Sequence, residues 1–241
     1  MYFAYLNEKK AEYYNGIKIK ADLGLHEQIA NKILKLIPKG ARILDFGAGE
    51  GALSQRLNDL GYYVISADID EINFKAQTDF IKVNFNNDNE VKSFIDKHCN
   101  SFDLVLGIEV IEHLENPWHY IKDLKMLVKA GGYILVTTPN ITSWFSRLIF
   151  LKTGRFHQFQ DSDRVYGHIN PISADELELI CEMNQLDKVT IEPAGTLPRI
   201  WIKKSILATL KNIFGYIASF GMKGIYDGWC IMGIFQKNIK E

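Results

Sequence analysis

The sequence is poor in several features that would place it in a special class of protein. Its 241 residues include only three cysteines, Cys99, Cys181 and Cys230, which lie far apart and never form a C-x-x-C pair. This pattern argues against a disulfide framework or a zinc ribbon and favours a reducing compartment. The sequence also has no internal repeat, no low-complexity tract and no linker rich in proline or serine. We therefore expect a single domain over residues 1–241.

Long hydrophobic runs are also absent. No charge-free apolar run reaches the roughly 18 residues needed to span a membrane, and the longest candidate, 130–146, contains Gly131, Gly132 and Pro139. The first residues, MYFAYLNEKKAEYY, carry mixed charges and no apolar run, so we expect no secretory signal. The expected location is cytoplasmic, with peripheral contact with a membrane left open.

The net charge of −1 conceals an uneven distribution of charged residues. Residues 124–160 and 199–224 each contain five Lys or Arg and no Asp or Glu. Such segregation can mark a surface for anionic partners, but it also arises on basic helix faces that have no partner. Because the total charge is near neutral and no known RNA-binding module is present, nucleic acid is not an expected partner.

The composition, 47% hydrophobic and 24% charged, is ordinary for a globular protein. Apolar runs alternate with helical patterns, which predicts β-α units around a parallel sheet. The predicted strands are Arg42–Phe46, Tyr63–Ala67, Phe80–Val83, Asp103–Gly107, Tyr133–Thr137, Lys188–Glu192 and Trp229–Gln236. The predicted helices are Leu25–Leu36, Ala52–Asp59, Glu90–Lys97, Pro117–Val128 and Ala174–Asn184.

Two segments interrupt this alternation and carry the basic excess. Residues 141–171 form a long aromatic connection, of the kind that usually serves as a lid or a binding loop. Residues 198–223 have apolar side chains at spacings of three and four, which predicts an inserted amphipathic helix. We expect the two segments to lie close together on the acceptor side of a site. The alternative for the helix is an intramolecular cap.

The stretch RILDFGAGEGALSQRL is the most informative part of the sequence. A strand ends in Asp45, and Gly47, Gly49 and Gly51 follow before a helix begins. Glycines at this place allow the backbone to approach a ligand closely, and the helix N-terminus faces the same crevice. The next strand ends in Asp68, where an acid can bind ribose hydroxyls. The alternative for the glycines is a tight turn that binds no ligand, and the alternative for Asp68 is a structural role in a turn. If Asp68 does not bind the ribose, Asp70 is the next candidate.

The spacing and charge of this loop distinguish between two nucleotide ligands. Nicotinamide cofactors are bound by G-x-G-x-x-G, whereas the spacing here is G-x-G-x-G. Asp45 and Glu50 flank the loop, and the nearest cations are Arg42 and Arg56. An acidic loop suits a ligand with positive groups better than a pyrophosphate. S-adenosylmethionine has a sulfonium and an ammonium and no phosphate, so it is the expected cofactor.

With these motifs the sequence resembles the class I S-adenosylmethionine-dependent methyltransferases, most clearly over residues 25–140. The resemblance also includes KVNF, FDLVLGIEVIEHLENP and GGYILVTTPN. It implies an α/β fold, a Rossmann-like three-layer α/β/α sandwich whose seven-stranded, mostly parallel sheet has an antiparallel last strand. It implies a cofactor site made by Asp45, Gly47, Gly49, Gly51, Asp68, Ile69, Asn84, Phe85 and Glu109. Asn84 could equally be an ordinary turn residue.

Within the family, the sequence resembles quinone-biosynthesis O-methyltransferases and the small-RNA 2′-O-methyltransferases, in which two Glu and two His hold a divalent metal. The matching residues here are Glu109, Glu112, His113 and His168. We favour a histidine base, with His113 and His168 as the catalytic residues, over a metal. Each histidine could instead be a packing residue, and His26, His98, His119 and His157 are taken as surface or packing residues.

The expected function is S-adenosylmethionine-dependent O-methylation of a small-molecule, glycan or lipid-linked acceptor. The alternatives are a non-catalytic cofactor-binding scaffold, because a fold alone does not secure a function, and an RNA 2′-O-methyltransferase.

Overall fold

The computed structural model describes residues 12–197 and 206–239. Its strands are β1 (Tyr13–Tyr14), β2 (Ile17–Lys18), β3 (Arg42–Phe46), β4 (Tyr63–Asp68), β5 (Asp79–Lys82), β6 (Phe102–Ile108), β7 (Val128–Pro139), β8 (Leu186–Ala194) and β9 (Cys230–Lys237). Its helices are α1 (Leu25–Leu36), α2 (Ala52–Asp59), α3 (Asp88–His98), the 3-10 turn η1 (Ile111–His113), α4 (Pro117–Leu127), α5 (Trp144–Thr153), α6 (Asp161–Arg164), α7 (Ala174–Met183) and α8 (Ile206–Ser219).

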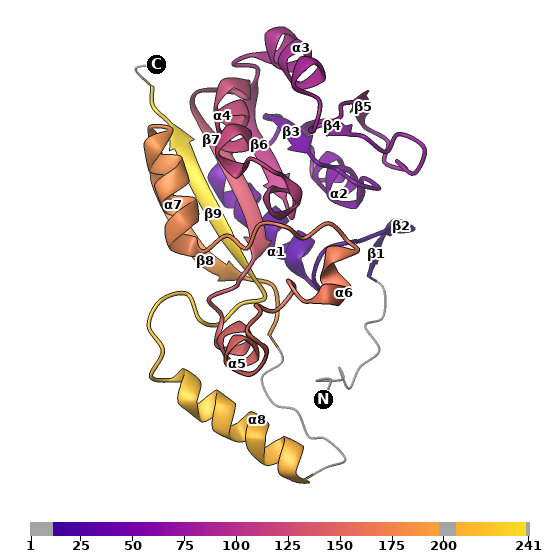
Figure 1. Cartoon of the computed structure of the whole chain (residues 1–241). Coiled ribbons are helices and arrows are strands. Elements are labelled where there is room, and N and C mark those ends of the chain that lie inside the picture. The colour runs from indigo at the N-terminus through magenta and orange to yellow at the C-terminus, as the bar shows by residue number, and fades with distance from the viewer. Residues whose placement is uncertain (1–11, 198–205, 240–241) are drawn as a thin grey trace.

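Seven strands form one sheet in the order β5-β4-β3-β6-β7-β9-β8 (Figure 1). The pairs from β5 to β7 are parallel, and β9 runs antiparallel to both of its neighbours, β7 and β8. The predicted mostly parallel sheet with an antiparallel last strand is therefore confirmed. The strand order reverses between β3 and β6, and in such sheets ligands bind at that point, beyond the carboxyl ends of the strands.

Helices cover both faces of the sheet, which gives the predicted three layers. One apolar cluster joins the sheet to α3, α4 and α7 through side chains such as Phe94, Leu124 and Leu177. A second cluster joins the other face to α1 and α2 through Ile29, Ile33 and Leu57, all fully buried. Each of these helices presents its apolar stripe to the sheet, because burial of that stripe supplies most of its stability.

The predicted elements of this α/β body match the observed ones to within about two residues, with one exception. Strand β7 begins at Val128, at the residue where the predicted helix ended, and its register with β6 shifts between Phe102 and Leu104. The Gly131-Gly132 pair lies in this irregular part of the strand, and Gly131 has a φ of 77°. Strand periodicity could not detect the extension because the segment is a bulge and not a regular ladder.

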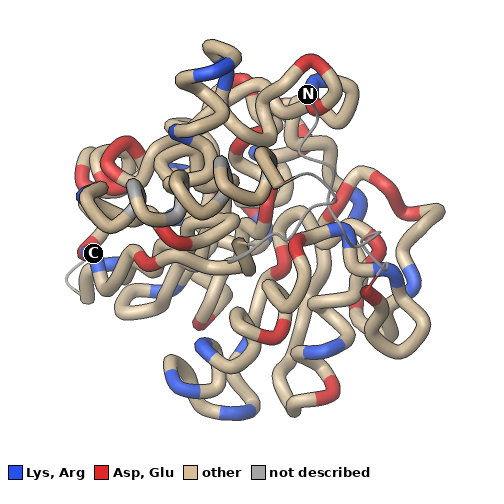
Figure 2. Tube along the Cα trace, turned by 90° about the horizontal axis from the view of Figure 1, so that it is seen from below, with Lys and Arg blue, Asp and Glu red and all other residues tan. Residues whose placement is uncertain are grey.

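The two inserted segments contain α5, α6 and α8. Helix α8 contacts α5, away from the sheet (Figure 1), and Arg147 on α5 donates a hydrogen bond to the carbonyl of Lys223. The predicted helix over 198–223 is observed as α8, which ends four residues earlier, at Ser219; residues 198–205 lie outside the described residues. No helix among residues 12–197 and 206–239 is long and apolar enough to cross a membrane. Acidic and basic residues are interspersed over the α/β body (Figure 2).

A short hairpin precedes the α/β body. Strands β1 and β2 meet at Asn15 and Gly16, which both have positive φ, as tight two-residue hairpins require. Tyr14 donates a hydrogen bond to Asp59 at 2.9 Å, and the guanidinium of Arg56 lies over its ring. The hairpin is thus fixed to α2, and the chain continues from β2 along the crevice.

Candidate active site

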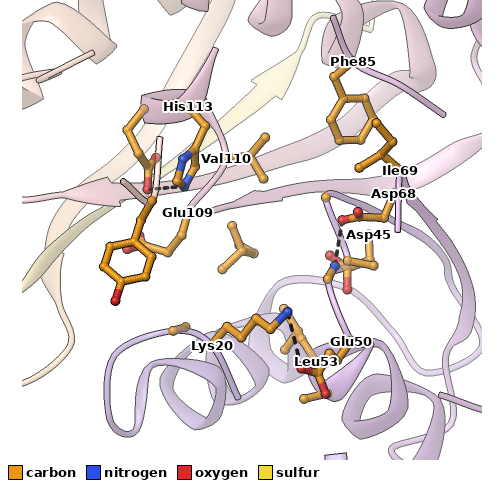
Figure 3. A pocket seen from close by; sticks show the side chains of 18 of the residues that line it. Lys20, Asp45, Glu50, Leu53, Asp68, Ile69, Phe85, Glu109, Val110 and His113 are labelled. Carbon is orange, nitrogen blue, oxygen red and sulfur yellow. Dashed lines mark hydrogen bonds and ion pairs between the residues drawn. The ribbon is translucent and has the colours of Figure 1, made fainter. Parts of the chain in front are cut away.

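A cavity of about 610 Å³ opens at the carboxyl ends of β3, β4 and β6. Its wall contains every residue predicted for the cofactor except Gly51, and it also contains Glu112, His113 and His168. Figure 3 shows Asp68 on one side of the cavity and Glu109 and His113 on the other, with Lys20 between them. One open cavity therefore joins the predicted cofactor residues to the predicted catalytic residues.

The three glycines of the loop after β3 differ in what surrounds them. All three have positive φ: 113° at Gly47, 55° at Gly49 and 88° at Gly51. A Cβ atom at Gly47 would lie 2.3 Å from Val110, and one at Gly51 would lie 2.6 Å from Ala76. A Cβ atom at Gly49 would meet nothing within 4 Å. Gly47 and Gly51 are therefore required by packing, whereas Gly49 borders open space in the cavity.

The two acids of the loop have different surroundings. Asp68 is half-buried, and its carboxylate accepts hydrogen bonds from the backbone of Gly49 at 2.8 Å and of Asp70 at 3.0 Å. Asp45 is buried and accepts a hydrogen bond from the hydroxyl of Ser54 at 2.6 Å. Burial raises the pKa of Asp45 to about 6, and the Ser54 hydrogen bond opposes this shift. Asp68 can thus bind a ligand directly, whereas Asp45 is a buried residue of the cavity wall.

The wall beyond Asp68 is made by Ile69, Asn84 and Phe85. The Phe85 ring packs on Phe46 with a centroid distance of 4.3 Å. The side-chain oxygen of Asn84 accepts a hydrogen bond from the backbone of Asn86 at 3.0 Å, as in an Asx turn. Asn84 therefore has the turn role that the sequence left open, and it also borders the cavity.

Glu109 follows β6 with an unusual backbone conformation. Its φ is 54°, and its N–H donates to the carbonyl and the hydroxyl oxygen of Thr137 at 3.2 and 3.0 Å. Non-glycine residues with positive φ are uncommon, and they concentrate at functional sites. Its carboxylate accepts a hydrogen bond from the thiol of Cys230 at 3.3 Å. Glu109 is therefore held from both sides at the edge of the cavity.

Glu112, His113 and His168 converge at the opposite end. One ligand atom from each lies within 4.8 Å of the others, and the rings of His113 and His168 meet edge to face at 4.8 Å. Glu109 is not part of this group. The backbone N–H groups of Ile169 and Asn170 both donate to the carbonyl of Glu112 at 3.0 Å, which fixes the His168 segment over η1.

The electrostatics of this cluster follow from its burial. Glu112 is fully buried, and neither carboxylate oxygen has a hydrogen-bond partner among the described residues. Burial, then the charge of Glu109, raises the pKa of Glu112 well above its usual value. Burial, then the neighbouring His168, lowers the pKa of His113. The ring nitrogen Nδ1 of His168 faces the carbonyl of Gln158 at 2.9 Å. Since a carbonyl only accepts, Nδ1 carries the proton and Nε2 of neutral His168 has a free lone pair.

Sequence reasoning missed several residues of the cavity wall. They are Lys18, Lys20, Asp22, His26, Gln158, Tyr166 and Trp229. Assigning His26 to surface or packing overlooked that it borders the cavity, whereas His157 does pack, between Phe145 and Trp229. The missed residues come from the hairpin, from α1, from the segment near α6 and from the start of β9. None of them belongs to a local motif, so only the tertiary structure could reveal them.

The sequence matches the family model described as "Methyltransferase domain" over residues 22–191. Relatives include ubiquinone biosynthesis O-methyltransferases from Maricaulis maris, 34% identical over 44% of this chain and 43% of the relative, and from Cereibacter sphaeroides, 27% identical over 58% and 62%. The matches thus span less than two thirds of the length of these relatives.

Solved structures with the same fold include a SAM-dependent methyltransferase from Archaeoglobus fulgidus. It has a TM-score of 0.59 and 19% identity, and the match covers 88% of this chain and 94% of that one. Another is magnesium protoporphyrin IX methyltransferase from Synechocystis with bound SAH, with a TM-score of 0.56, 12% identity and coverage of 88% and 82%. These likenesses show the fold, and the family model covers more than half of the chain. The chain therefore belongs to the family of methyltransferase domains, as its sequence predicted.

Proposed function

We propose that this protein is an S-adenosylmethionine-dependent O-methyltransferase acting on a small molecule. The observation that carries the proposal is the single cavity that joins the acidic glycine loop to the histidine pair. Family membership and the relatives named ubiquinone biosynthesis O-methyltransferases support it. A scaffold that only bound the cofactor would not need His113 and His168 to converge at this cavity.

The described residues fit this cofactor. The open space at Gly49 is a cradle that a side chain would fill, and the acids around it favour positively charged groups. Asp68 would bind the ribose hydroxyls, and Ile69, Asn84 and Phe85 would enclose the adenine. When bound, the cofactor supplies a methyl group on a sulfonium, which is a good leaving group. The work of the protein is then to align the acceptor oxygen with that methyl and to exclude water.

We assign the general base to the histidine pair. Nε2 of His168 has a free lone pair because Nδ1 donates to Gln158. It would take the proton from the acceptor hydroxyl as the new C–O bond forms. The edge of His113 against the His168 ring, together with the anchoring of residues 169–170 to Glu112, would hold the base in place.

A divalent cation is the competing assignment for this cluster. The donor set, one buried carboxylate without a hydrogen-bond partner and two imidazoles, fits a cation completed by water or acceptor oxygens. Glu112, His113 and His168 would hold it, and a metal there would lower the pKa of the acceptor hydroxyl. We favour the histidine base, because the hydrogen bond from Nδ1 of His168 to the carbonyl of Gln158 already orients its ring.

We further propose that the acceptor is lipid-linked and that the protein contacts a membrane peripherally. The described apolar side chains of α8, which include Ile206, Leu210, Phe214 and Ile217, are 44–81% exposed. Amphipathic helices normally bury this stripe, but here it faces outward. Residues 199–224 also lack any acidic residue. Exposed apolar side chains in a stretch of sequence that is basic suit an anionic bilayer, and this favours a lipid-linked acceptor over a glycan.

Two measurements test the chemistry. Calorimetry should show binding of S-adenosylhomocysteine (SAH) and none of NAD, and the reverse result would refute the cofactor assignment. Incubation with methyl-labelled cofactor and separate lipid, glycan, RNA and small-molecule fractions should place the label in a lipid or small-molecule product. Label in RNA alone, or no transfer to any fraction, would contradict the proposed reaction.

Removal of metal separates the two catalytic assignments. With a histidine base, activity should survive chelation, and His168→Ala should lose about 10²–10⁴-fold in rate. With a metal, chelation should abolish activity and Mg²⁺ or Mn²⁺ should restore it. Full activity in both His113→Ala and His168→Ala would defeat both assignments.

Sedimentation with vesicles tests the membrane contact. The protein should pellet with phosphatidylglycerol vesicles at low salt and should pellet less with pure phosphatidylcholine vesicles. Phe214→Asp should abolish pelleting, whereas Tyr63→Asp, an exposed site on the α/β body, should not. Retention in the supernatant at every salt concentration would overturn this contact.

A further inference from the structure

The peptide group that joins β3 to the glycine loop is held at both ends by hydrogen bonds from other parts of the chain. Its N–H, on Gly47, donates to the carbonyl of Ala67 at 2.8 Å. Its carbonyl, on Phe46, accepts a hydrogen bond from the hydroxyl of Tyr120 on α4 at 2.9 Å. Because a peptide group is planar, these two contacts fix the direction in which the chain leaves the strand. Gly47 borders the cavity, so this direction also sets where the loop lies there.

Tyr120 brings a polar group into an apolar layer. Other side chains on the buried face of α4, such as Ile121 and Leu124, are apolar and fully buried. Tyr120 is 4% exposed, and removing a hydroxyl from water costs free energy unless the hydroxyl forms a hydrogen bond. Burial raises the pKa of Tyr120 well above its usual value, so the hydroxyl keeps its proton and donates it to the carbonyl of Phe46.

A glycine in β6 makes room for this hydroxyl. A Cβ atom at Gly107 would lie 2.7 Å from the hydroxyl oxygen of Tyr120 and 3.1 Å from its ring. Glycine inside a strand weakens the strand, because it has no side chain to pack and loses more conformational entropy on folding. Its neighbours Leu106 and Ile108 are buried and apolar. A buried hydroxyl and a glycine in a strand are both unfavourable alone, and the hydrogen bond to Phe46 accounts for both.

The ring of Tyr120 also supports the cavity wall through a row of aromatic side chains. It lies nearly parallel to the ring of Phe46, with a centroid distance of 5.9 Å and an interplanar angle of 11°. The Phe46 ring packs in turn on Phe85, which borders the cavity. Close-packed side chains transmit displacements to their neighbours. Tyr120 thus acts on two adjoining parts of the proposed cofactor site, although it is not part of the cavity wall.

We propose that Tyr120 is a positioning residue for the cofactor, because its hydrogen bond to Phe46 holds the glycine loop in the conformation that binds the adenosyl group. This inference rests on the proposed function, since it assumes that the cofactor binds at this loop. Tyr120 touches no ligand and acts through Phe46 and Phe85. Without the hydroxyl, the loop should adopt other conformations for part of the time, and the apparent affinity falls with the fraction that remains competent to bind.

Calorimetry with SAH tests this role. Tyr120→Phe removes only the hydroxyl and should weaken SAH binding about three- to tenfold, the equivalent of one hydrogen bond. Tyr62→Phe is the matched control, because Tyr62 is also buried and its hydroxyl donates to the carbonyl of Ile37 at 3.4 Å, away from the cavity wall. This control should bind SAH within about twofold of the unaltered protein. Urea unfolding should show that both variants remain folded, so a loss of affinity confined to Tyr120→Phe reports on the loop.

Gly107→Ala disturbs the same hydrogen bond from the other side. Its methyl group would meet the Tyr120 hydroxyl, so it should displace that hydroxyl from the carbonyl of Phe46 and weaken SAH binding to a similar extent. The double variant with Tyr120→Phe lacks the atom that the methyl group would meet. The two losses of SAH affinity should therefore not add, as is expected of residues that share one contact.

Each outcome bears on a different part of the proposal. If the unaltered protein binds SAH and both Tyr120→Phe and Gly107→Ala bind it as tightly, the positioning role is wrong and the proposed function stands. Losses that add in the double variant, or an equal loss in Tyr62→Phe, would also overturn the role. If Tyr120→Phe does not fold, the comparison of Gly107→Ala with Tyr62→Phe decides the question. If the unaltered protein does not bind SAH, the proposed function fails together with this role.

Discussion

The thiol of Cys230 donates a hydrogen bond to Oε2 of Glu109 across 3.3 Å, so the antiparallel strand β9 contacts the acid that borders the cavity. Cys230 is fully buried, and Glu109 holds its positive φ beside it. If Glu109 touches the cofactor, the thiol acts as a positioning group. Cys230→Ala should then weaken SAH binding about three- to tenfold, since one hydrogen bond to a carboxylate is lost.

Cys230→Ser is the control for that prediction, because it keeps a donor of similar size and should bind SAH nearly as well as the unaltered protein. Thermal unfolding of both variants separates a lost contact from a weakened fold. Unchanged SAH affinity in Cys230→Ala would show that the hydrogen bond serves only packing.

The ribose assignment predicts a contrast between two neighbouring acids. Asp68→Ala should weaken SAH binding by about 1.5–3 kcal/mol, the contribution of hydrogen bonds to a charged group. Asp70→Ala should have little effect, because Asp70 is not part of the cavity wall and holds the Asn73 side chain at 2.7 Å. Calorimetry on both variants decides between the two acids. A larger loss of SAH affinity in Asp70→Ala would assign ribose binding to Asp70.

The glycine loop predicts that two similar substitutions have different consequences. Gly51→Ala should destabilise the fold by about 2–4 kcal/mol, because the new methyl meets Ala76 at 2.6 Å in a left-handed conformation. Gly49→Ala should cost about 1–2 kcal/mol for its positive φ and should abolish SAH binding by filling the cavity. Urea unfolding and calorimetry measure the two effects. SAH binding by a stable Gly49→Ala protein would exclude the ligand from that space.

The buried carboxyl of Asp45 should make the free energy of unfolding of this protein depend on pH. Burial raises the pKa of Asp45 to about 6, whereas an unfolded Asp titrates near about 3.9. Between these values the unfolded chain loses its proton and the folded protein keeps it. The contribution of Asp45 is therefore fully present below about pH 4 and is lost as the pH rises to about 6, at a cost of about 3 kcal/mol.

Asp45→Asn should remove that loss, so its free energy of unfolding, relative to the unaltered protein, should increase between pH 4 and 6. Ser54→Ala should lose further stability above about pH 6, because the Ser54 hydrogen bond lowers the pKa of Asp45 and its removal extends the range in which the folded protein keeps the proton. Chemical denaturation across and above this range measures both differences. Parallel stability curves for all three proteins would contradict the shift.

Local sequence patterns predicted the fold and the part of the site that is made by the glycine loop and Asp68. Asp68 could be placed because it ends a strand that pairs with β3, and the loop glycines could be placed because a strand and a helix flank them. These positions depend on neighbours in the sequence and on one rule of sheet topology.

The rest of the site, which includes His168, His26 and Lys20, depends on long-range contacts that sequence patterns do not encode. His168 reaches His113 only because two backbone groups at 169–170 bind the carbonyl of Glu112. His26 borders the cavity because α1 packs beside α2, and its sequence context matches that of an ordinary packed histidine. Lys20 is positioned by the hairpin that Tyr14 ties to Asp59. Each depends on a long-range contact with no local signal.

The place of β9 in the sheet has a consequence for how the chain acquires its structure. Strand β8 pairs only with β9 among the strands of the sheet, and β9 also covers the edge of β7. A nascent chain that has not yet emerged past residue 230 therefore presents two strands with unpaired edges, and such edges invite association with other chains. Closure of the sheet and delivery of Cys230 to Glu109 occur together, so the site cannot mature on the ribosome before β9 is released.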